Sequence, residues 1–104
     1  MIAVVRTTPE ADVLIREASR WWHTHREATR GLFDAELVGA ISLLAHAPDV
    51  GHRYPRRGIP GLRRLLLPRT RYHVYYVHAA ARAEVIVLAV WSAVRGRGPA
   101  LKVS

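Results

Sequence analysis

The chain has 104 residues, half of them hydrophobic, which is enough for one domain with a single modest core. It contains no cysteine, which excludes disulfides, a thiolate nucleophile and Cys-ligated zinc, and it holds no run near the roughly 20 apolar residues that span a bilayer, so we expect a soluble, cytoplasmic protein. Residues 1–49 carry five Arg against seven acidic residues, a net of −2, whereas residues 50–104 carry ten Arg and one Lys against one Glu, a net of +10.

The first half of the chain predicts a strand and two helices. Residues 2–5 form a short, largely β-branched run, typical of a strand. A helix is expected to begin at Pro9, because Thr8 offers a cap and Glu10 an acid in the first turn, and to continue until Gly31. A second helix should end before Pro48, and its apolar face is marked by Leu37, Ala40, Ile41, Leu44 and Ala45. Two helices joined by a few residues form an antiparallel hairpin.

The second half predicts a loop, three strands and a tail. Residues 48–60 hold three Pro, two Gly and three Arg, which indicates an exposed basic loop. Residues 62–67, 71–78 and 84–91 have strand character and short connections, which favours an antiparallel meander. Residues 92–104 are expected to form a flexible basic tail that folds back over the sheet or becomes ordered on a partner.

Alternation along the middle strand assigns its two faces. Tyr72, Val74 and Tyr76 should pack on the helices, while the opposite face shows Arg71, His73 and Tyr75. The whole chain, residues 1–104, is then one α/β (α+β) domain of order β-α-α-β-β-β. Its helical hairpin packs on an antiparallel sheet.

This order, together with residues 62–65, 69–76 and 89–99, resembles the RelE/ParE superfamily of toxins from type II toxin-antitoxin operons. The resemblance implies a cognate acidic antitoxin as partner, contact with operator DNA only through that antitoxin, and no cofactor. The basic second half agrees with such a partner, since concentrated positive charge attracts polyanions. The alternative is that the arginines only keep the protein soluble.

The superfamily has two mechanistic branches. ParE-like members block DNA gyrase, whereas RelE-like members are ribosome-dependent mRNA endoribonucleases. His73 stands where the nuclease branch typically has Arg, and Ser92 stands where many relatives have His. These differences favour the ParE-like branch. The rival is a nuclease with Arg64, Arg71, His73 and Arg95 as its catalytic set, and a third reading is a regulatory module that only joins its antitoxin at the operator.

Further residues are predicted to bind the target or nucleic acid, because they combine positive charge with loop backbone: Arg53, Arg56, Arg57, Arg95 and Arg97. Those predicted to bind the antitoxin are Trp21, Trp22, Arg63 and Tyr75. Neighbouring positions on a helix point about 100° apart, so one of the two Trp should pack and the other should border a groove, unless both belong to a wide core face.

Two predictions concern histidines. Nearby arginines should lower the pKa of His73 and leave a neutral imidazole that can act as a base, although it can equally be a half-buried structural residue stacked on Tyr75. His23 and His25 lie two positions apart on a helix and project to different sides. We therefore predict no metal site.

Overall fold

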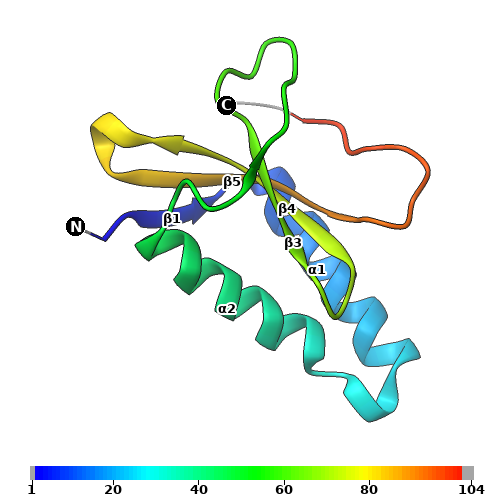
Figure 1. Ribbon diagram of the computed structural model, residues 1–104. Coiled ribbons are helices and arrows are strands. Elements are labelled where there is room, and N and C mark those ends of the chain that lie inside the picture. The colour runs from blue at the N-terminus through cyan, green and yellow to red at the C-terminus, as the bar shows by residue number, and fades with distance from the viewer. Residues whose placement is uncertain (1, 102–104) are drawn as a thin grey trace.

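The computed structural model describes residues 2–101. Its elements follow in the order β1 (Val4–Thr7), α1 (Pro9–His25), the 3-10 turn η1 (Glu27–Thr29), α2 (Leu32–His46), β2 (His52–Arg53), β3 (Arg63–Leu67), β4 (Tyr72–Ala79), the 3-10 turn η2 (Ala80–Arg82) and β5 (Glu84–Ser92). Figure 1 shows the two helices below and behind one sheet. The predicted α+β order is confirmed, with the two-residue strand β2 added inside the basic loop.

The sheet has five strands in the order β1-β5-β4-β3-β2. The meander of β3, β4 and β5 is antiparallel, as predicted, but β1 pairs with β5 in parallel, from Val4 opposite Glu84 to Thr7 opposite Val87. The sheet is therefore mixed. The two helices between β1 and the later strands supply the long connection that a parallel pair needs.

Helix α1 begins where its sequence predicts and ends earlier. The Thr8 hydroxyl accepts a hydrogen bond from the backbone N–H of Ala11 at 3.1 Å, and Pro9 occupies the first turn. The helix stops at His25 because Arg26 leaves helical geometry, with φ −132° and ψ 67°. Gly31, expected to end this helix, instead precedes α2 with an ordinary φ of −86°.

The core lies between the helices and one face of the sheet. Helix α2 buries Phe33, Leu37, Ala40 and Leu44. They meet a cluster on α1 and on strands β3 to β5 that includes Ala11, Ala18, Trp22, Leu67, Val74, Tyr76, Val85, Val87 and Val90. The predicted inward side of the middle strand is thus confirmed. No helix within residues 2–101 is both long enough and apolar enough to cross a membrane.

The opposite face of the sheet is covered as well, by the tail, as one of the two alternatives for it predicted, and by the loop before β3, which the sequence did not predict. A second cluster joins Ile59 and Leu62 of the loop to Tyr75, Ile86, Leu88 and Ala89 of the sheet. Figure 1 shows the C-terminal segment leaving β5 and returning beside that loop. There the Arg56 guanidinium donates a hydrogen bond to the Pro99 carbonyl at 3.4 Å. Residues 93–101 therefore fold back over the sheet, and residues 102–104 of the predicted tail lie outside the described residues.

Candidate functional site

All three tryptophans of the chain line one groove, which we call the tryptophan groove. It has a volume of about 630 Å³ and lies between the C-terminal half of α1, the turn that joins β3 to β4, and the end of β5. Its lining comprises Leu14, Glu17, Ala18, Trp21, Trp22, Arg26, Arg69, Thr70, Arg71, Tyr72, Val90, Trp91, Ser92, Val94 and Arg95. Segments far apart in the sequence therefore form one continuous surface.

The two adjacent tryptophans of α1 divide their roles as the helical geometry requires. Trp22 belongs to the core and is 9% exposed, whereas Trp21 is 41% exposed. The Trp21 ring stacks on His25 with a centroid distance of 4.7 Å, and the Arg26 guanidinium lies 5.5 Å from its centroid. Trp21 is thus the tryptophan that borders the groove with an open surface.

The groove is rimmed by positive charge. Four arginines, Arg26, Arg69, Arg71 and Arg95, face a single acidic lining residue, Glu17. The Arg95 guanidinium lies 4.4 Å from the centroid of Trp91, a distance typical of a cation–π contact. Within residues 2–101, none of the four takes part in a salt bridge. Their charge is therefore available to a negatively charged ligand.

Glu36 of α2 holds the turn that carries two of these arginines. Its carboxylate accepts hydrogen bonds from the Arg69 N–H at 2.8 Å, the Thr70 N–H at 2.9 Å and the Thr70 hydroxyl at 2.6 Å. Burial raises the pKa of Glu36, but the hydrogen bonds from Thr70 and Arg69 and the charge of Arg69 outweigh it, so the pKa is lowered overall. The carboxylate is ionised at neutral pH and fixes the turn.

The sequence predicted Arg71 on the middle strand. In the structure it is instead the last residue of this turn, with a positive φ of 63°. For a residue other than glycine, this left-handed backbone conformation costs about 1–2 kcal/mol. Such strain persists where the surrounding structure imposes it, often at a binding surface. Here Glu36 holds the preceding residue Thr70, the Arg71 N–H donates a hydrogen bond to the Leu67 carbonyl at 2.8 Å, and Arg71 lines the groove.

His73 lies on the second face of the sheet, opposite Leu66 of β3 and Trp91 of β5. Burial lowers its pKa, and the positive charges of Arg64 and Arg71 lower it further. The imidazole is therefore neutral near pH 7 and can accept a proton from a hydroxyl. Three of the four predicted nuclease residues thus lie near one another, and Arg95 stacks on the strand neighbour of His73.

The guanidinium of Arg64 is engaged with an aromatic ring. It lies 4.5 Å from the centroid of Tyr54, whose ring meets Tyr75 edge to face at 5.4 Å. Tyr75 is 3% exposed, although it was expected on the open face of the sheet, because the loop residues Ile59 and Leu62 pack on it. The residues that cover Tyr75 belong to the segment between β2 and β3, and the alternation of side chains along a strand does not predict how such a segment folds.

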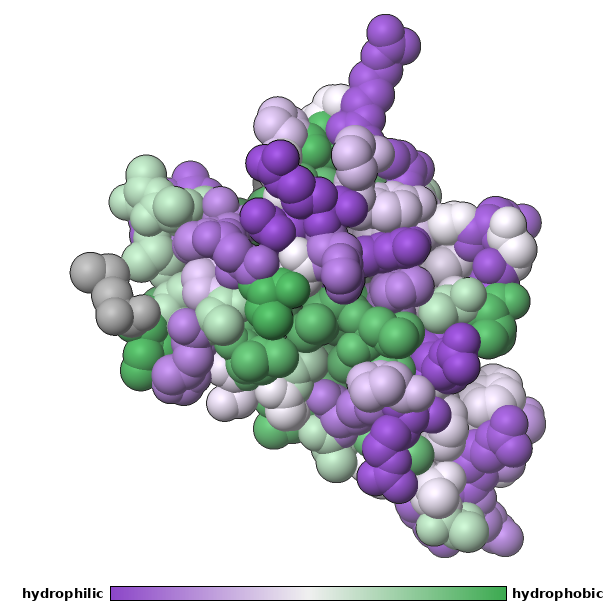
Figure 2. All heavy atoms as spheres, viewed as in Figure 1, coloured by the Kyte–Doolittle hydropathy of each residue, from purple (hydrophilic) through white to green (hydrophobic). Residues whose placement is uncertain are grey.

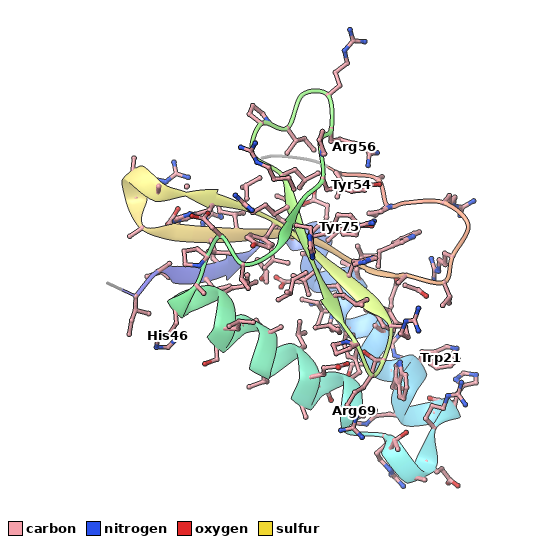
Figure 3. All side chains as sticks on the ribbon, viewed as in Figure 1. Trp21, His46, Tyr54, Arg56, Arg69 and Tyr75 are labelled. Atoms are coloured by element: carbon pink, nitrogen blue, oxygen red, sulfur yellow. The ribbon has the colours of Figure 1, made fainter. Side chains whose placement is uncertain are left out.

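The remaining basic candidates lie elsewhere. Arg63 serves the fold, since it donates to the carbonyl of Gly51 at 2.8 Å and to that of Asp49 at 3.1 Å. Arg53 ends strand β2, and Arg56 and Arg57 belong to the loop that follows it. The carbonyl of Arg97 accepts a hydrogen bond from the Trp91 indole at 2.8 Å. Figure 3 shows Arg56 near Tyr54, away from Trp21 and Arg69.

The histidines of α1 are engaged with nearby groups. His23 contacts the Asp34 carboxylate at 3.0 Å, and His25 contacts the Trp21 carbonyl at 2.9 Å. Residues 2–101 hold no group of three or more His, Cys, Asp or Glu side chains that could bind a metal ion.

No protein-family model matches the chain, and no curated protein matches its sequence. Solved structures do match its shape. A chain of the chromosomal ParDE toxin-antitoxin system of P. aeruginosa superimposes with a TM-score of 0.68 at 16% identity, covering 88% of this chain and 96% of that one. The chain has the fold of the RelE and ParE toxins.

Two further structures agree with this RelE/ParE fold. A chain of the RelBE2 toxin-antitoxin complex from Mycobacterium tuberculosis matches with a TM-score of 0.61 at 22% identity, covering 88% of this chain and 99% of that one. A mutant E. coli RelE toxin in the free state matches with a TM-score of 0.58 at 17% identity, covering 90% of this chain and 86% of that one. Both branches of the superfamily are thus similar in fold to this chain.

Proposed function

We propose that this protein is the toxin of a type II toxin-antitoxin pair that acts in the cytoplasm. In this proposal it arrests growth by binding DNA gyrase and is neutralised by an acidic cognate antitoxin. The RelE/ParE fold supports the first part, since the similar structures are toxins or toxin-antitoxin complexes. The net charge of +10 on residues 50–104 supports an acidic partner.

Exposed apolar side chains also support a protein that is covered by a partner. Helix α2 has no Asp, Glu, Lys or Arg after Glu36, and it exposes Val38 and Leu43 to solvent. Leu66 of β3 is exposed as well, on the second face of the sheet beside His73. Figure 2 shows hydrophobic side chains gathered in a band across the middle of one face, with hydrophilic side chains above it. A partner that covers such a surface gains binding energy and keeps the toxin soluble.

We prefer gyrase over mRNA as the target because of the contacts and the protonation of the candidate catalytic residues. Arg64 and Arg95 lie against the rings of Tyr54 and Trp91, and His73 is the only member of the nuclease set that can exchange a proton near neutral pH. Cleavage of RNA needs both a base for the 2′-hydroxyl and an acid for the leaving oxygen. A single neutral imidazole supplies only the base.

The second candidate function is a RelE-like endoribonuclease. One observation favours it: His73 is neutral and lies in the positive field of Arg64 and Arg71, which suits stabilisation of a negatively charged phosphorane. In that case the incoming RNA or the ribosome would have to supply the missing acid.

Induction of the protein without an antitoxin distinguishes the two functions. Total transcript integrity and plasmid supercoiling are followed in the same culture, for the wild type, for His73→Ala and for the control His46→Ala at the exposed end of α2. We expect growth arrest and altered supercoiling with intact mRNA in all three. Discrete mRNA cleavage that His73→Ala abolishes and His46→Ala preserves would instead establish the nuclease. An absence of any growth defect would leave the regulatory module.

A further inference from the structure

We propose that two copies of this protein associate through the solvent-facing side of helix α2, across a twofold axis. We call this side the α2 outer face, and it comprises the exposed residues Ala35, Val38, Gly39, Ser42 and Leu43. In such a contact the same surface of each copy packs on itself, so the surface has to be complementary to its own copy. The inference goes beyond the proposed function and does not depend on the target of the toxin.

Helix α2 is largely apolar on both of its sides between Glu36 and His46, although only its inner side packs in the core. On the outer side Val38 is 67% exposed and Leu43 is 44% exposed. A helix that is hydrophobic all round is typical of a buried position. Figure 1 shows α2 in the foreground, with no other segment drawn in front of it. The outer face is therefore a surface that we expect a partner to cover.

The apolar surface continues past the last turn of the helix. The Ala3 N–H donates a hydrogen bond to the Ala45 carbonyl at 2.8 Å, so Ile2 lies beside this turn, and Ile2 is 61% exposed. Val50 donates to the carbonyl of Ala47, the first residue after the helix, and is 44% exposed. Single exposed apolar residues are common on soluble proteins, whereas a group of them marks an interaction site.

The distribution of charge identifies a second copy as the occupant. The chain carries a net charge of +8, so two copies repel each other unless their arginines stay apart. Residues 31–52 contain no Arg and no Lys, and their acidic residues are Asp34, Glu36 and Asp49. A contact between two α2 outer faces therefore brings two uncharged surfaces together and leaves the arginines of both copies outside the interface.

An acidic antitoxin and nucleic acid are poorer fits for this face. Carboxylates or phosphates would find no guanidinium or ammonium group on α2, and they would approach the three acidic residues of this segment. Juxtaposed like charges oppose association, whereas two neutral apolar faces carry no such penalty. The basic rim of the tryptophan groove offers polyanions a better surface on the same molecule.

The middle of the α2 outer face allows two helices to approach closely. Gly39 lies there with the small residues Ala35 and Ser42, and a Cβ added at Gly39 would meet no atom within 4 Å. Packed helix axes lie about 8–10 Å apart, and small residues at the crossing favour the shorter distance. Val38 and Leu43 flank this centre on either side, so each can pack against the partner helix.

The size of the face sets the expected strength of the dimer. Helix α2 has 15 residues, which corresponds to a length of about 22 Å. Two such helices bury less than the roughly 800 Å² per partner of a standard stable interface. We therefore expect a weak dimer that dissociates on dilution.

The test measures the mass of the purified protein by sedimentation equilibrium between about 1 µM and about 1 mM. We expect the mass to rise from the monomer value of 11.7 kDa toward twice that value. Raising NaCl from about 50 mM to about 500 mM should strengthen the association, because salt screens the repulsion between two basic chains. An interface built from ion pairs would weaken instead, and that result would contradict the inference.

Charge variants at Gly39 locate the contact. Gly39→Arg and Gly39→Glu each bring two like charges together near the twofold axis, so each should weaken the dimer at least about tenfold. An equimolar mixture of the two should restore it, because opposite charges then meet. Ala100→Arg and Ala100→Glu, at an exposed position of the tail over the opposite face of the sheet, are matched controls that should leave the association unchanged.

The Gly39 variants are expected to fold, because Arg and Glu both favour a helix more than glycine does and position 39 has open space around it. Thermal unfolding of dilute samples should give melting temperatures no lower than that of wild type. Three results would overturn the inference: a mass of 11.7 kDa at every concentration, a dimer that Gly39→Arg leaves intact, or a mixture of the two folded Gly39 variants that stays monomeric.

Discussion

Replacing Glu36 by glutamine should destabilise the protein, because its carboxylate joins helix α2 to the turn between β3 and β4. The side chain accepts three hydrogen bonds, from two backbone N–H groups and the Thr70 hydroxyl. An amide keeps one acceptor oxygen but places its own N–H groups against these donors. Hydrogen bonds to a charged group contribute about 1.5–3 kcal/mol each, and neutral ones about 1. With a discount for partial exposure, we expect Glu36→Gln to cost about 2 kcal/mol.

The pH dependence provides a second signature of the same contact. Glu36 has a lower pKa in the folded protein than its ordinary value of 4.5. Its contribution to stability is therefore fully present above pH 4.5 and is lost as the pH falls through the lower, folded pKa. The difference in the free energy of unfolding between wild type and Glu36→Gln should be largest near pH 7 and should shrink below pH 4.5.

Urea denaturation followed by tryptophan fluorescence measures this difference at each pH. Glu27→Gln, which changes an exposed carboxylate in the 3-10 turn, is the matched control and should stay within about 0.5 kcal/mol of wild type. Equal midpoints for wild type and Glu36→Gln at pH 7 would refute the clamp. A difference that stays constant down to pH 3 would refute its electrostatic origin.

Four further substitutions test the packing and the backbone conformation. Trp22→Ala should lower the free energy of unfolding by about 3–5 kcal/mol, whereas Trp21→Ala should lower it by about 1 kcal/mol, since only Trp22 is a core side chain. Thermal unfolding of the two variants measures this difference, and equal losses would contradict the assigned roles. Gly51→Ala should destabilise by about 1–3 kcal/mol, because a Cβ there would lie 2.7 Å from the Tyr76 hydroxyl oxygen and 2.9 Å from the Arg64 carbonyl oxygen, and an unchanged midpoint in urea denaturation would contradict that reason. Ala83→Gly should raise the unfolding free energy by up to about 1 kcal/mol, because φ at this position is 50°, and an unchanged or lower melting temperature would contradict that reason.

Local patterns were enough to predict the elements that depend on neighbouring residues. The cap at Thr8 and the proline after it mark the start of α1, and alternation along residues 72–76 identifies the side that packs on the helices. The predicted end of α1 was wrong. Gly31 was expected to end this helix in a left-handed conformation, but its φ is −86°.

Contacts between distant residues were not predictable in this way. Glu36 lies 33 and 34 positions before the residues that it clamps, and nothing in the neighbouring sequence marks it as different from Asp34. Tyr75 alternates with inward residues and so was expected to be exposed, yet the loop around Ile59 and Leu62 covers it. Burial of an outer sheet face depends on where loops settle, which periodicity does not encode.

For the candidate site as well, local features were predictable and contacts between distant residues were not. Trp21 and Trp22 were singled out because their angular separation on a helix prevents both from packing, and the structure assigns the open position to Trp21. A groove beside one Trp was predicted, but its other walls were not, since they come from the turn at Arg69 and the end of β5. Only the tertiary fold brings the three tryptophans together.

The most direct test of the proposed function is a supercoiling assay with purified DNA gyrase and increasing amounts of the purified protein. The account predicts that supercoiling is lost as the protein is added, that His73→Ala inhibits as strongly as wild type, and that a translating extract keeps its mRNA intact at the same protein concentration. Full gyrase activity together with cleaved mRNA in that extract would contradict the account and would make the face around His73 catalytic.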